Sequence, residues 1–490
     1  MTEPPVPQTL SEATALLEML WAEVVAARAE QARLQAVVGR LEARVHELEA
    51  RLGQTSANSS QPPSADPPQA PSRPPRPPTG RRQGAQPGHP AHQRTLLPPE
   101  QVDASHDHYP PVCQHCQAPL APDPAQAVGD PIRHQVVDLP PVRAEVTDHY
   151  LHRLRCPHCQ GETRASLPPD VPPGAFGPRV QAVIALLCGR YRLSRREVAA
   201  LCADLLGVDL AVGSVDELCQ ATAAALAAPV AEVQAAVQQA GAVNADETSW
   251  RLAGQRCWLW VVVTVTATLF TVAASRGSGV IKGLLGETFA GVVGSDRWSA
   301  YTWVAPHRRQ VCWAHLKRDF QALVDWSAAA RPVGEAALAL LDELFDAWHQ
   351  ARDDPAARAR LAETVAPIQA AFRTLLEEGT TNPSPKAAGL CRALLTLWPA
   401  LWTFVTVPGV EPTNNAAERA IRPAVLWRRG SFGCQSEAGV LFVARMLSVA
   451  ATCRQQGRPL LDYLTAVCTA AQHGQPTPAL LPDRPATQAA

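Results

Sequence analysis

The first fifty residues repeat apolar side chains every seven positions. One heptad position holds Leu10, Leu17, Val24, Gln31, Val38, Val45 and Leu52, and the position three residues later holds Ala13, Leu20, Ala27, Leu34, Leu41 and Leu48. Only Gln31 is polar, and a single polar residue in such a seam often fixes register and oligomer number. The pattern predicts a coiled-coil helix over residues 8–53 and therefore a homo-oligomer. The alternative, packing onto the chain's own body, is disfavoured because a proline-rich segment follows the helix.

That segment, residues 54–104, is rich in proline and glycine, which prevent a packed core. The formal net charge of the whole chain is −1, but this segment is basic. Between Pro62 and Pro99 its basic residues are Arg73, Arg76, Arg81, Arg82 and Arg94 with His89 and His92. A flexible linker whose arginines, Arg81 and Arg82 among them, contact DNA phosphates without reading sequence is one interpretation. A solvated spacer explains the composition equally well.

Two Cys-x-x-Cys pairs follow, Cys113 with Cys116 and Cys156 with Cys159. Four thiolates suffice for a closed tetrahedral zinc site, so residues 105–168 are predicted to form a structural zinc module. Strands over 132–139 and 142–154 would form a hairpin that brings the pairs together. His115 and His158 are alternative ligands, and a redox role is disfavoured because no thioredoxin-like unit surrounds the pairs.

Residues 176–236 have the periodicity of helices. Ser194 with Glu197, and Ser214 with Glu217, have the spacing of capping boxes, and Gly207 is placed to end the first helix. Two short helices joined by a turn resemble a helix-turn-helix that contacts DNA. A plain helical pair that links domains explains the pattern equally well.

The middle of the chain predicts a sheet. Apolar residues precede Asp246 and Asp296, which are therefore expected at strand ends, and β-branched and aromatic residues predict two strands between them, over 257–266 and 269–273. Three strands, a short helix and a fourth strand form the order of a ribonuclease-H-like core. After Asp296 the sequence is helical in pattern, and residues 321–404 are too long for a simple connection.

A third acid, Glu418, is expected on a helix capped by Thr413 or Asn414. Asp246, Asp296 and Glu418 together could hold two Mg²⁺ or Mn²⁺ ions about 4 Å apart, which suits phosphodiester chemistry. For any one of them, an ordinary surface acid is the alternative. The cations predicted to bind DNA phosphates near these acids are Arg308, Lys317, Arg318, Arg419, Arg422, Arg428 and Arg429. His315 is expected either to assist proton transfer or, more simply, to satisfy a buried hydrogen bond.

Four motifs resemble one known family. They are Asp246-Glu247-Thr248, Ser295-Asp296-Arg297-Trp298 with Tyr301, the stretch from Cys312 to Phe320, and the stretch from Thr413 to Pro423. In this order they resemble the insertion-sequence 66 family of bacterial DDE transposases, and the resemblance runs nearly end to end. It implies that Asp246, Asp296 and Glu418 are the catalytic acids, and that the zinc module helps to hold transposon-end DNA.

The resemblance also implies the activity. The enzyme would bind transposon ends, cleave them with two metal ions and join them to target DNA by transesterification, and small accessory proteins of the mobile element would be partners. Two other functions use the same features: a DNA-binding regulator that has lost catalysis, and a ribonuclease-H-like nuclease that cuts without strand transfer.

The expected fold class is multidomain, combining α+β and α/β. It comprises the coiled coil, the linker, the zinc module and the helical region, then a catalytic core over 240–320 and 405–456, an inserted all-helical subdomain over 321–404, and a C-terminal segment over 457–490. No run of about 18 apolar residues and no secretory signal is found, so no membrane partner and a cytoplasmic location are expected. Thirteen cysteines, an odd number, fit a reducing compartment.

Overall fold

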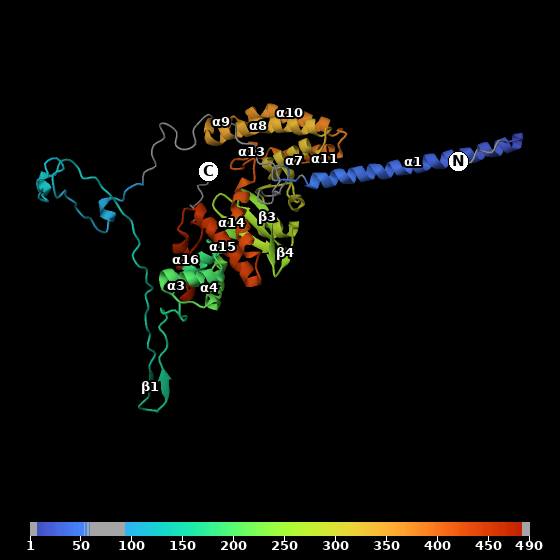
Figure 1. Cartoon of the computed structure of the whole chain (residues 1–490). Helices are drawn as coiled ribbons and strands as arrows, with labels where there is room; N and C mark the ends of the chain where they lie inside the picture. The colour runs from blue at the N-terminus through green and yellow to red at the C-terminus, as the bar shows by residue number, and fades with distance from the viewer. Residues whose placement is uncertain (1–6, 53, 56–57, 59–93, 483–490) are drawn as a thin grey trace. The chain divides into compact units, whose positions relative to one another are not determined.

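The computed structural model describes residues 7–52, 54, 55, 58 and 94–482 (Figure 1). Within this part, the chain divides into two compact units: residues 94–146 with 204–208 form one, and the remainder forms the other. Most of the linker, including Arg81 and Arg82, lies outside the described residues. No helix in the described ranges is both long enough and apolar enough to cross a lipid bilayer.

The heptad segment forms one continuous helix, α1, over Leu10–Leu52. A capping box opens it: the Thr9 hydroxyl accepts a hydrogen bond from the Glu12 N–H at 3.2 Å, and the Glu12 carboxylate accepts one from the Thr9 N–H at 3.2 Å. Along the helix the heptad side chains are exposed; Leu17 is 67% exposed and Leu41 60%. The predicted helix is thus present, and its pairing into a coiled coil stays a prediction.

The region of the cysteine pairs has little regular structure. Its only strands among the described residues are β1 (Arg153–Arg155) and β2 (Glu162–Arg164), which pair antiparallel. The predicted hairpin over 132–154 is therefore wrong. Its apolar side chains have nothing to pack against, since Ile132 is 98% exposed and Leu139 85%, and a lone two-stranded hairpin is marginally stable in water.

Four helices follow: α2 (Pro178–Gly189), α3 (Arg195–Leu206), α4 (Val212–Ala225) and α5 (Ala227–Gln238). The predicted box before α3 is confirmed, because the Ser194 N–H donates to the Glu197 carboxylate at 2.8 Å and the Glu197 N–H donates to the Ser194 hydroxyl at 3.2 Å. Gly207 has a φ of 63° and lies directly after α3, as predicted. The second box is wrong, because α4 already begins at Val212 and encloses Ser214.

A five-stranded mixed sheet forms the centre of the larger unit. Its strands are β3 (Ala242–Leu252), β4 (Gln255–Val263), β5 (Thr268–Ala273), β6 (Val292–Ser295) and β7 (Arg309–Val311), in the order β5-β4-β3-β6-β7. The first three strands are antiparallel, whereas β3, β6 and β7 run parallel. Helix α6 (Ser278–Leu285) connects β5 to β6. The predicted order of three strands, a helix and a fourth strand is confirmed.

The length of β3 corrects one expectation. Asp246 lies within this strand and not at its end, because β3 continues to Leu252 in a hairpin with β4. The hairpin turns at Ala253 and Gly254, whose φ angles of 48° and 77° are both positive. Two such residues form the type I′ turn that matches the natural twist of paired strands.

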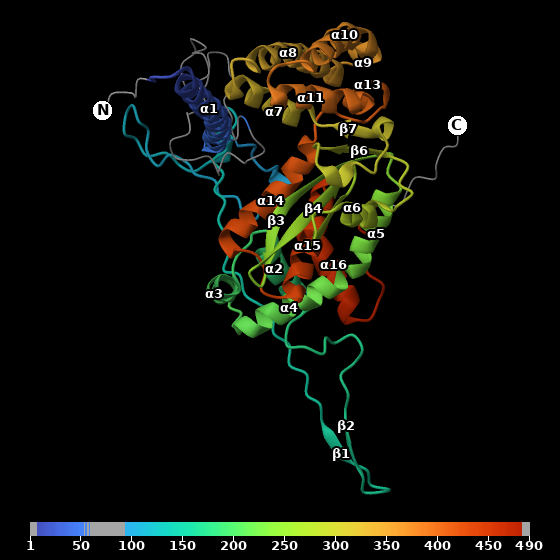
Figure 2. The ribbon, with the colours of Figure 1, turned by 90° about the vertical axis from the view of Figure 1, so that its right-hand side faces the viewer.

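Helices cover the sheet (Figure 2). Helix α15 (Glu437–Gln455) begins at Ser436, whose hydroxyl accepts from the Gly439 N–H at 3.2 Å. On its buried face, Ser448 accepts a hydrogen bond from the Phe270 N–H at 2.8 Å, and Thr452 accepts one from the Thr268 N–H at 3.1 Å. These bonds satisfy edge groups of β5 that would otherwise be buried without partners. Helix α14 (Asn415–Ser431) packs on β3 and β4, and α16 (Leu460–Gln472) packs on α2.

Between β7 and α14 the regular elements are all helices. The helices are α7 (Trp313–Trp326), α8 (Arg331–Asp353), α9 (Pro355–Ala359), α10 (Leu361–Gly379), α11 (Pro385–Thr396), α12 (Trp398–Leu401) and α13 (Thr403–Thr406). Trp313, which is fully buried, centres their core: its ring lies 5.2 Å from that of Phe372 and 5.0 Å from that of Trp402. The same core includes Val292 of β6 and Val311 of β7, so these helices share apolar packing with the sheet.

We expect two glycines of these helices to respond in opposite ways to alanine. A Cβ at Gly334 of α8 would lie 2.7 Å from the Phe320 carbonyl oxygen of α7, whereas a Cβ at Gly389 of α11 meets nothing within 4 Å. Gly334→Ala should lower the free energy of unfolding by about 1–3 kcal/mol through overpacking. Gly389→Ala should raise it by about 0.5–1 kcal/mol, because alanine loses less backbone entropy in a helix. Urea unfolding of both variants measures the difference; equal shifts would contradict the close approach of α7 and α8.

Candidate active site

Asp246 and Asp296 lie at the same edge of neighbouring parallel strands. The pairing of β3 with β6 ends at Asn244 opposite Gly294, and each aspartate follows two residues later in its own strand direction. The two positions therefore lie on one face of the sheet. Gly294 is required here, because a Cβ would lie only 2.5 Å from the Asn244 side-chain oxygen. As expected from the sequence, the fold brings the two aspartates together.

The environment of Asp246 is strongly negative. Burial raises its pKa well above the usual value of 3.8, and the neighbouring charges of Glu247, Asp296 and Glu418 raise it further. One hydrogen bond opposes this effect, from the Glu247 N–H to the Asp246 carboxylate at 2.8 Å. Asp296 accepts a hydrogen bond from the Trp298 N–H at 2.9 Å. Carboxylates crowded in this way favour a bound cation or a bound proton.

Glu418 lies in the first turn of α14, and Asn414 fixes where that helix begins. The Asn414 amide donates to the Ala245 carbonyl at 2.9 Å, and its backbone N–H donates to the Cys312 sulfur at 3.1 Å. Asn414 is the residue that precedes the helix, as predicted, but its side chain does not cap α14. The predicted cap is wrong because the side chain instead bonds to β3, beside Asp246.

The Glu418 side chain faces α7 in this structure. One carboxylate oxygen lies 3.5 Å from His315 Nδ1, and the other lies 3.8 Å from Arg318 Nη2. Among the described residues, one set of three or more possible metal ligands (His, Cys, Asp or Glu) has all its ligand atoms within 4.8 Å of one another: Cys312, His315 and Glu418. His315 Nδ1 is buried without a hydrogen bond, so the expected buried hydrogen bond is not formed at that atom. In this structure Glu418 thus contacts His315 and Arg318 of α7.

Glu247 is a site residue that the sequence patterns missed. Its side chain is buried and accepts hydrogen bonds from the Tyr301 hydroxyl at 2.7 Å and from Arg276 at 2.8 Å. Arg276 in turn stacks on two rings, 3.8 Å from the centre of Trp298 and 4.8 Å from that of Trp258. Burial raises the pKa of Glu247, and Tyr301 and Arg276 oppose that shift. Alternation along β3 could have revealed it, because position 247 points to the same face as the buried residues 243 and 245.

Three of the predicted DNA-binding cations are engaged within the chain. Arg308 donates to the Phe289 carbonyl at 2.9 Å, and Lys317 pairs with Asp342 at 2.5 Å. Arg428 is partly buried against β3, where it donates to the Thr248 hydroxyl at 3.0 Å and to the backbone and side chain of Ser249; burial lowers its pKa. In this structure the guanidinium or ammonium groups of these three residues join neighbouring elements, and their contact with DNA phosphates stays a prediction.

The other predicted cations differ. Arg318 lies beside Glu418, as described above. Arg419, Arg422 and Arg429 are exposed on α14, and none of them forms an ion pair with another residue in the described ranges. A further cation, Arg309, lies beside the acids: it is 1% exposed and donates to the Asp296 carbonyl at 2.7 Å. Arg309 thereby holds the backbone that presents Asp296.

The two cysteine pairs form loops of matching geometry, each described by itself. In the first, the Gln117 N–H donates to the Cys113 carbonyl at 2.9 Å, and Gln117 has a φ of 62°. In the second, the Gln160 N–H donates to the Cys156 carbonyl at 2.9 Å, and Gln160 has a φ of 61°. Backbone N–H groups of the following residues lower the pKa of the Cys113 and Cys156 thiols. Both loops therefore favour thiolates, the form that binds zinc.

Comparison with protein families agrees with these features. Residues 110–160 match the zinc-finger binding domain of transposase IS66, and residues 173–441 match a family described as Transposase IS66 family. The molecule is thus a transposase-type protein with a zinc-finger domain. Because the second match spans more than half of the chain, the chain belongs to the IS66 transposase family. Residues 2–95 match a family of unknown function.

Two relatives from Sinorhizobium fredii, both called uncharacterized proteins, are similar to parts of the chain. The protein y4qI is 32% identical over 202 residues, which are 38% of this chain and 37% of y4qI. The protein y4hP is 26% identical over 358 residues, 64% of this chain and 63% of y4hP. The alignments thus cover less than two thirds of either relative.

Because acids crowd around Asp246, we expect Asp246→Asn to be more stable than the native chain without metal and less stable than it in excess Mn²⁺. In a chelator at neutral pH, Asp246→Asn should raise the free energy of unfolding by about 1 kcal/mol, because it removes a buried charge among like charges. Because the folded pKa of Asp246 is raised, this gain should shrink as the pH falls to about 4, where the unfolded carboxyl also becomes protonated. In excess Mn²⁺ the native chain should gain stability and the variant should not.

Thermal unfolding in chelator and in Mn²⁺ measures both effects. The matched control is Glu343→Gln, which removes an exposed acid from α8 and should respond to neither condition. Equal stabilisation of Asp246→Asn and the native chain by Mn²⁺ would contradict a metal site at Asp246.

Proposed function

We propose that this chain is a DDE transposase: it binds transposon ends, cleaves DNA and joins the cut end to a target by transesterification. The observation that carries the proposal is the convergence of three acids from distant segments, which is expressed in the raised pKa of Asp246. Asp246 and Asp296 come from adjacent parallel strands, and Glu418 comes from the helix that Asn414 ties to β3. Membership of the IS66 family supports the same activity.

The sheet supports a ribonuclease-H-like catalytic core. Three antiparallel strands continue into two parallel ones, with β3 in the centre carrying the first acid and β6 leading to the second. The two positions lie where the β3–β6 pairing ends, at the carboxyl end of this parallel pairing. The helices between β7 and α14 separate Glu418 from this core in sequence but not in space.

The donor set fits Mg²⁺ or Mn²⁺. Asp246 and Asp296 supply hard oxygen ligands, and the repulsion around Asp246 is what a divalent cation would relieve. Glu418 would join them by leaving its contacts with His315 and Arg318. When bound, two such ions would activate the attacking oxygen and stabilise the leaving oxygen of a phosphodiester. The residues of the chain would orient the strand: Arg318, Arg419 and Arg422 would hold phosphates, and the Glu247 network would keep β3 rigid.

The remaining segments fit the same function. The cysteine loops, through Cys113, Cys116, Cys156 and Cys159, would bind structural zinc and help to hold end DNA, while Arg81 and Arg82 would contact phosphates. Joining two transposon ends requires more than one copy of the enzyme, and the exposed heptad seam of α1 offers a homo-oligomer contact. Small accessory proteins of the element would be further partners, and the reaction would take place in the cytoplasm.

Strand transfer of labelled transposon-end DNA into a plasmid tests the activity. With Mg²⁺ or Mn²⁺ the native chain should give joined product, and Asp246→Asn and Glu418→Gln should each reduce it by at least about a hundredfold, because each removes a charge that acts at the reacting phosphate. Glu343→Gln should retain activity. Cleavage without joining would point to a nuclease, and binding without either reaction to a regulator.

Zinc content tests the cysteine loops separately. Metal analysis of the purified chain should find about one zinc ion per chain. Cys113→Ser combined with Cys156→Ser should abolish it, because a structural site needs four ligands. Cys434→Ser, which changes a cysteine outside both loops, should leave the zinc content unaltered. Full zinc content in the double variant would contradict these ligands.

A further inference from the structure

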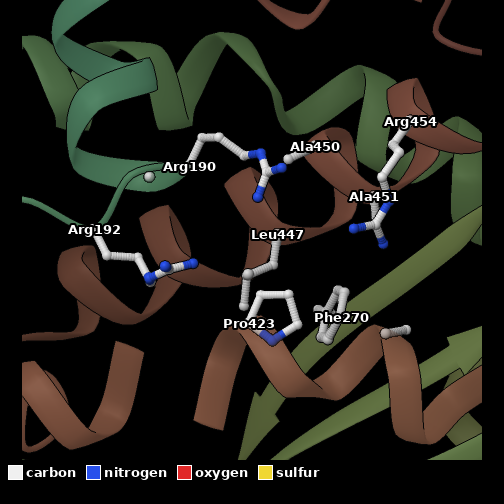
Figure 3. Close-up of a pocket in the computed structure, with 10 residues that line it drawn as sticks. Arg190, Arg192, Phe270, Pro423, Leu447, Ala450, Ala451 and Arg454 are labelled. Atoms are coloured by element: carbon white, nitrogen blue, oxygen red, sulfur yellow. The ribbon is translucent and has the colours of Figure 1, made fainter. Parts of the chain in front are cut away.

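A pocket with three arginines lies where the end of α2 meets α14 and α15 (Figure 3). Arg190 and Arg192 come from the turn after α2, and Arg454 comes from the last turn of α15. In Figure 3 their guanidinium groups point towards one another above a floor of apolar side chains, which includes Phe270, Pro423 and Leu447. The enclosed space measures only about 20 Å³ and continues into open solvent, so a ligand would lie at the mouth of the pocket, against the arginines.

The charges of this pocket are uncompensated by the residues around it. The lining contains no acidic side chain, and within the described ranges none of the three arginines forms an ion pair. Three cations that face one another repel, and an anion between them would relieve that repulsion. A guanidinium group presents paired N–H donors that match the oxygens of a phosphate.

The attraction of helix C-termini for cations accounts for two of the three arginines but not for Arg192. Arg190 follows α2 directly and Arg454 lies in the last turn of α15, where the carbonyl ends of helices favour positive charge. Arg192 lies beyond the helix end and has a φ of 65°, a conformation that residues other than glycine rarely adopt. The turn is held by the Leu193 N–H, which donates to the Leu187 carbonyl at 3.2 Å. This backbone aims a third arginine into the pocket.

The pocket adjoins the helix of Glu418. Ala420 and Pro423, which line it, belong to α14. At about 100° per residue, Arg422 lies about 40° around the helix from Glu418, Arg419 about 100° and Pro423 about 140°. Pro423 also lies only about 7.5 Å along the helix axis from Glu418, at roughly 1.5 Å per residue. The exposed Arg422 and Arg419 therefore occupy the surface between the glutamate and the pocket.

We propose that this pocket binds a phosphodiester group of the DNA strand that reaches Glu418, with Arg422 and Arg419 along its path. The inference rests on the proposed function, since it takes DNA as the partner. The surface path from Glu418 to the pocket is roughly 10–15 Å, which corresponds to about three or four base pairs at roughly 3.4 Å each. A contact at this distance fixes the register of the strand on the enzyme and carries no sequence information.

Salt dependence of DNA binding tests the pocket without requiring catalysis. The full-length chain with Asp246→Asn, which prevents turnover, is titrated against a labelled duplex of about 30 base pairs and arbitrary sequence, because phosphate contacts do not read bases. The pocket variant adds Arg190→Gln, Arg192→Asn and Arg454→Gln; asparagine tolerates the left-handed backbone at position 192. Its affinity should fall about tenfold at about 100 mM salt, and its slope of log affinity against log salt should be shallower by about 1 to 2.

Two further variants serve as controls. Arg179→Gln removes an exposed arginine from the other end of α2 and should leave affinity and slope unchanged. Arg454→Gln alone changes an exposed position, so it should fold even if the triple variant does not. It should still make the slope of log affinity against log salt measurably shallower.

The other outcomes overturn the proposal in distinguishable ways. An unchanged slope with a lowered melting temperature would show that the arginines only stabilise helix ends. An unchanged slope with loss of stabilisation by inorganic phosphate would show a site for a small anion. Failure of the parent chain to bind DNA would refute both this inference and the proposed function. A shallower slope together with absent strand transfer in the native chain would keep the pocket and refute only the transposase activity.

Discussion

One buried asparagine joins the segments on which the candidate site depends. Asn414 donates from its side chain to the Ala245 carbonyl of β3 and from its backbone to the sulfur of Cys312, next to the start of α7. Ala245 and Cys312 precede Asn414 by 169 and 102 residues in sequence. Because the asparagine is 1% exposed, both bonds are shielded from water and difficult to exchange for solvent. The position of Glu418, four residues later, follows from these two bonds and not from the preference of α14 itself.

Two neighbouring acids of β3, Asp246 and Glu247, have opposite electrostatic environments. Glu247 is neutralised by the chain, through Arg276 and Tyr301, and its partners are held by the rings of Trp258 and Trp298. Asp246, its neighbour on the other face of the strand, has no cationic partner among the causes that shift its pKa and is surrounded by further acids. Glu247 is thus satisfied within the chain, whereas the acids around Asp246 repel one another, and a cation bound as proposed would relieve that repulsion.

Local patterns predicted the elements well and the contacts between them poorly. The strands before Asp246 and Asp296 and the capping box at Ser194 follow from short-range periodicity and capping chemistry. The continuation of β3 beyond Asp246 was missed, because polar residues after the aspartate resemble a loop until β4 pairs with them.

Contacts between distant segments could not be predicted from local patterns. The partners of Glu247 lie 29 and 54 residues away in sequence, and no periodicity indicates them. Similarly, the engagement of Arg428 with β3, and the turning of Glu418 towards His315, depend on packing between distant segments. The predicted hairpin before Cys156 failed because apolar residues in sequence do not by themselves supply a surface to bury them.

Both edges of the sheet are occupied by side chains. Ser448 and Thr452 of α15 take the outward N–H groups of β5, and at the other edge Thr403 donates to the Arg309 carbonyl of β7 at 2.7 Å while Gln310 accepts from the Phe404 N–H at 2.8 Å. These bonds oppose the addition of a strand from another copy beside β5 or β7. Under the proposed function, copies of the chain that meet on DNA would therefore recognise one another through helices or loops. An intermediate that has not yet docked α15 would expose the β5 edge, on which aggregation could begin.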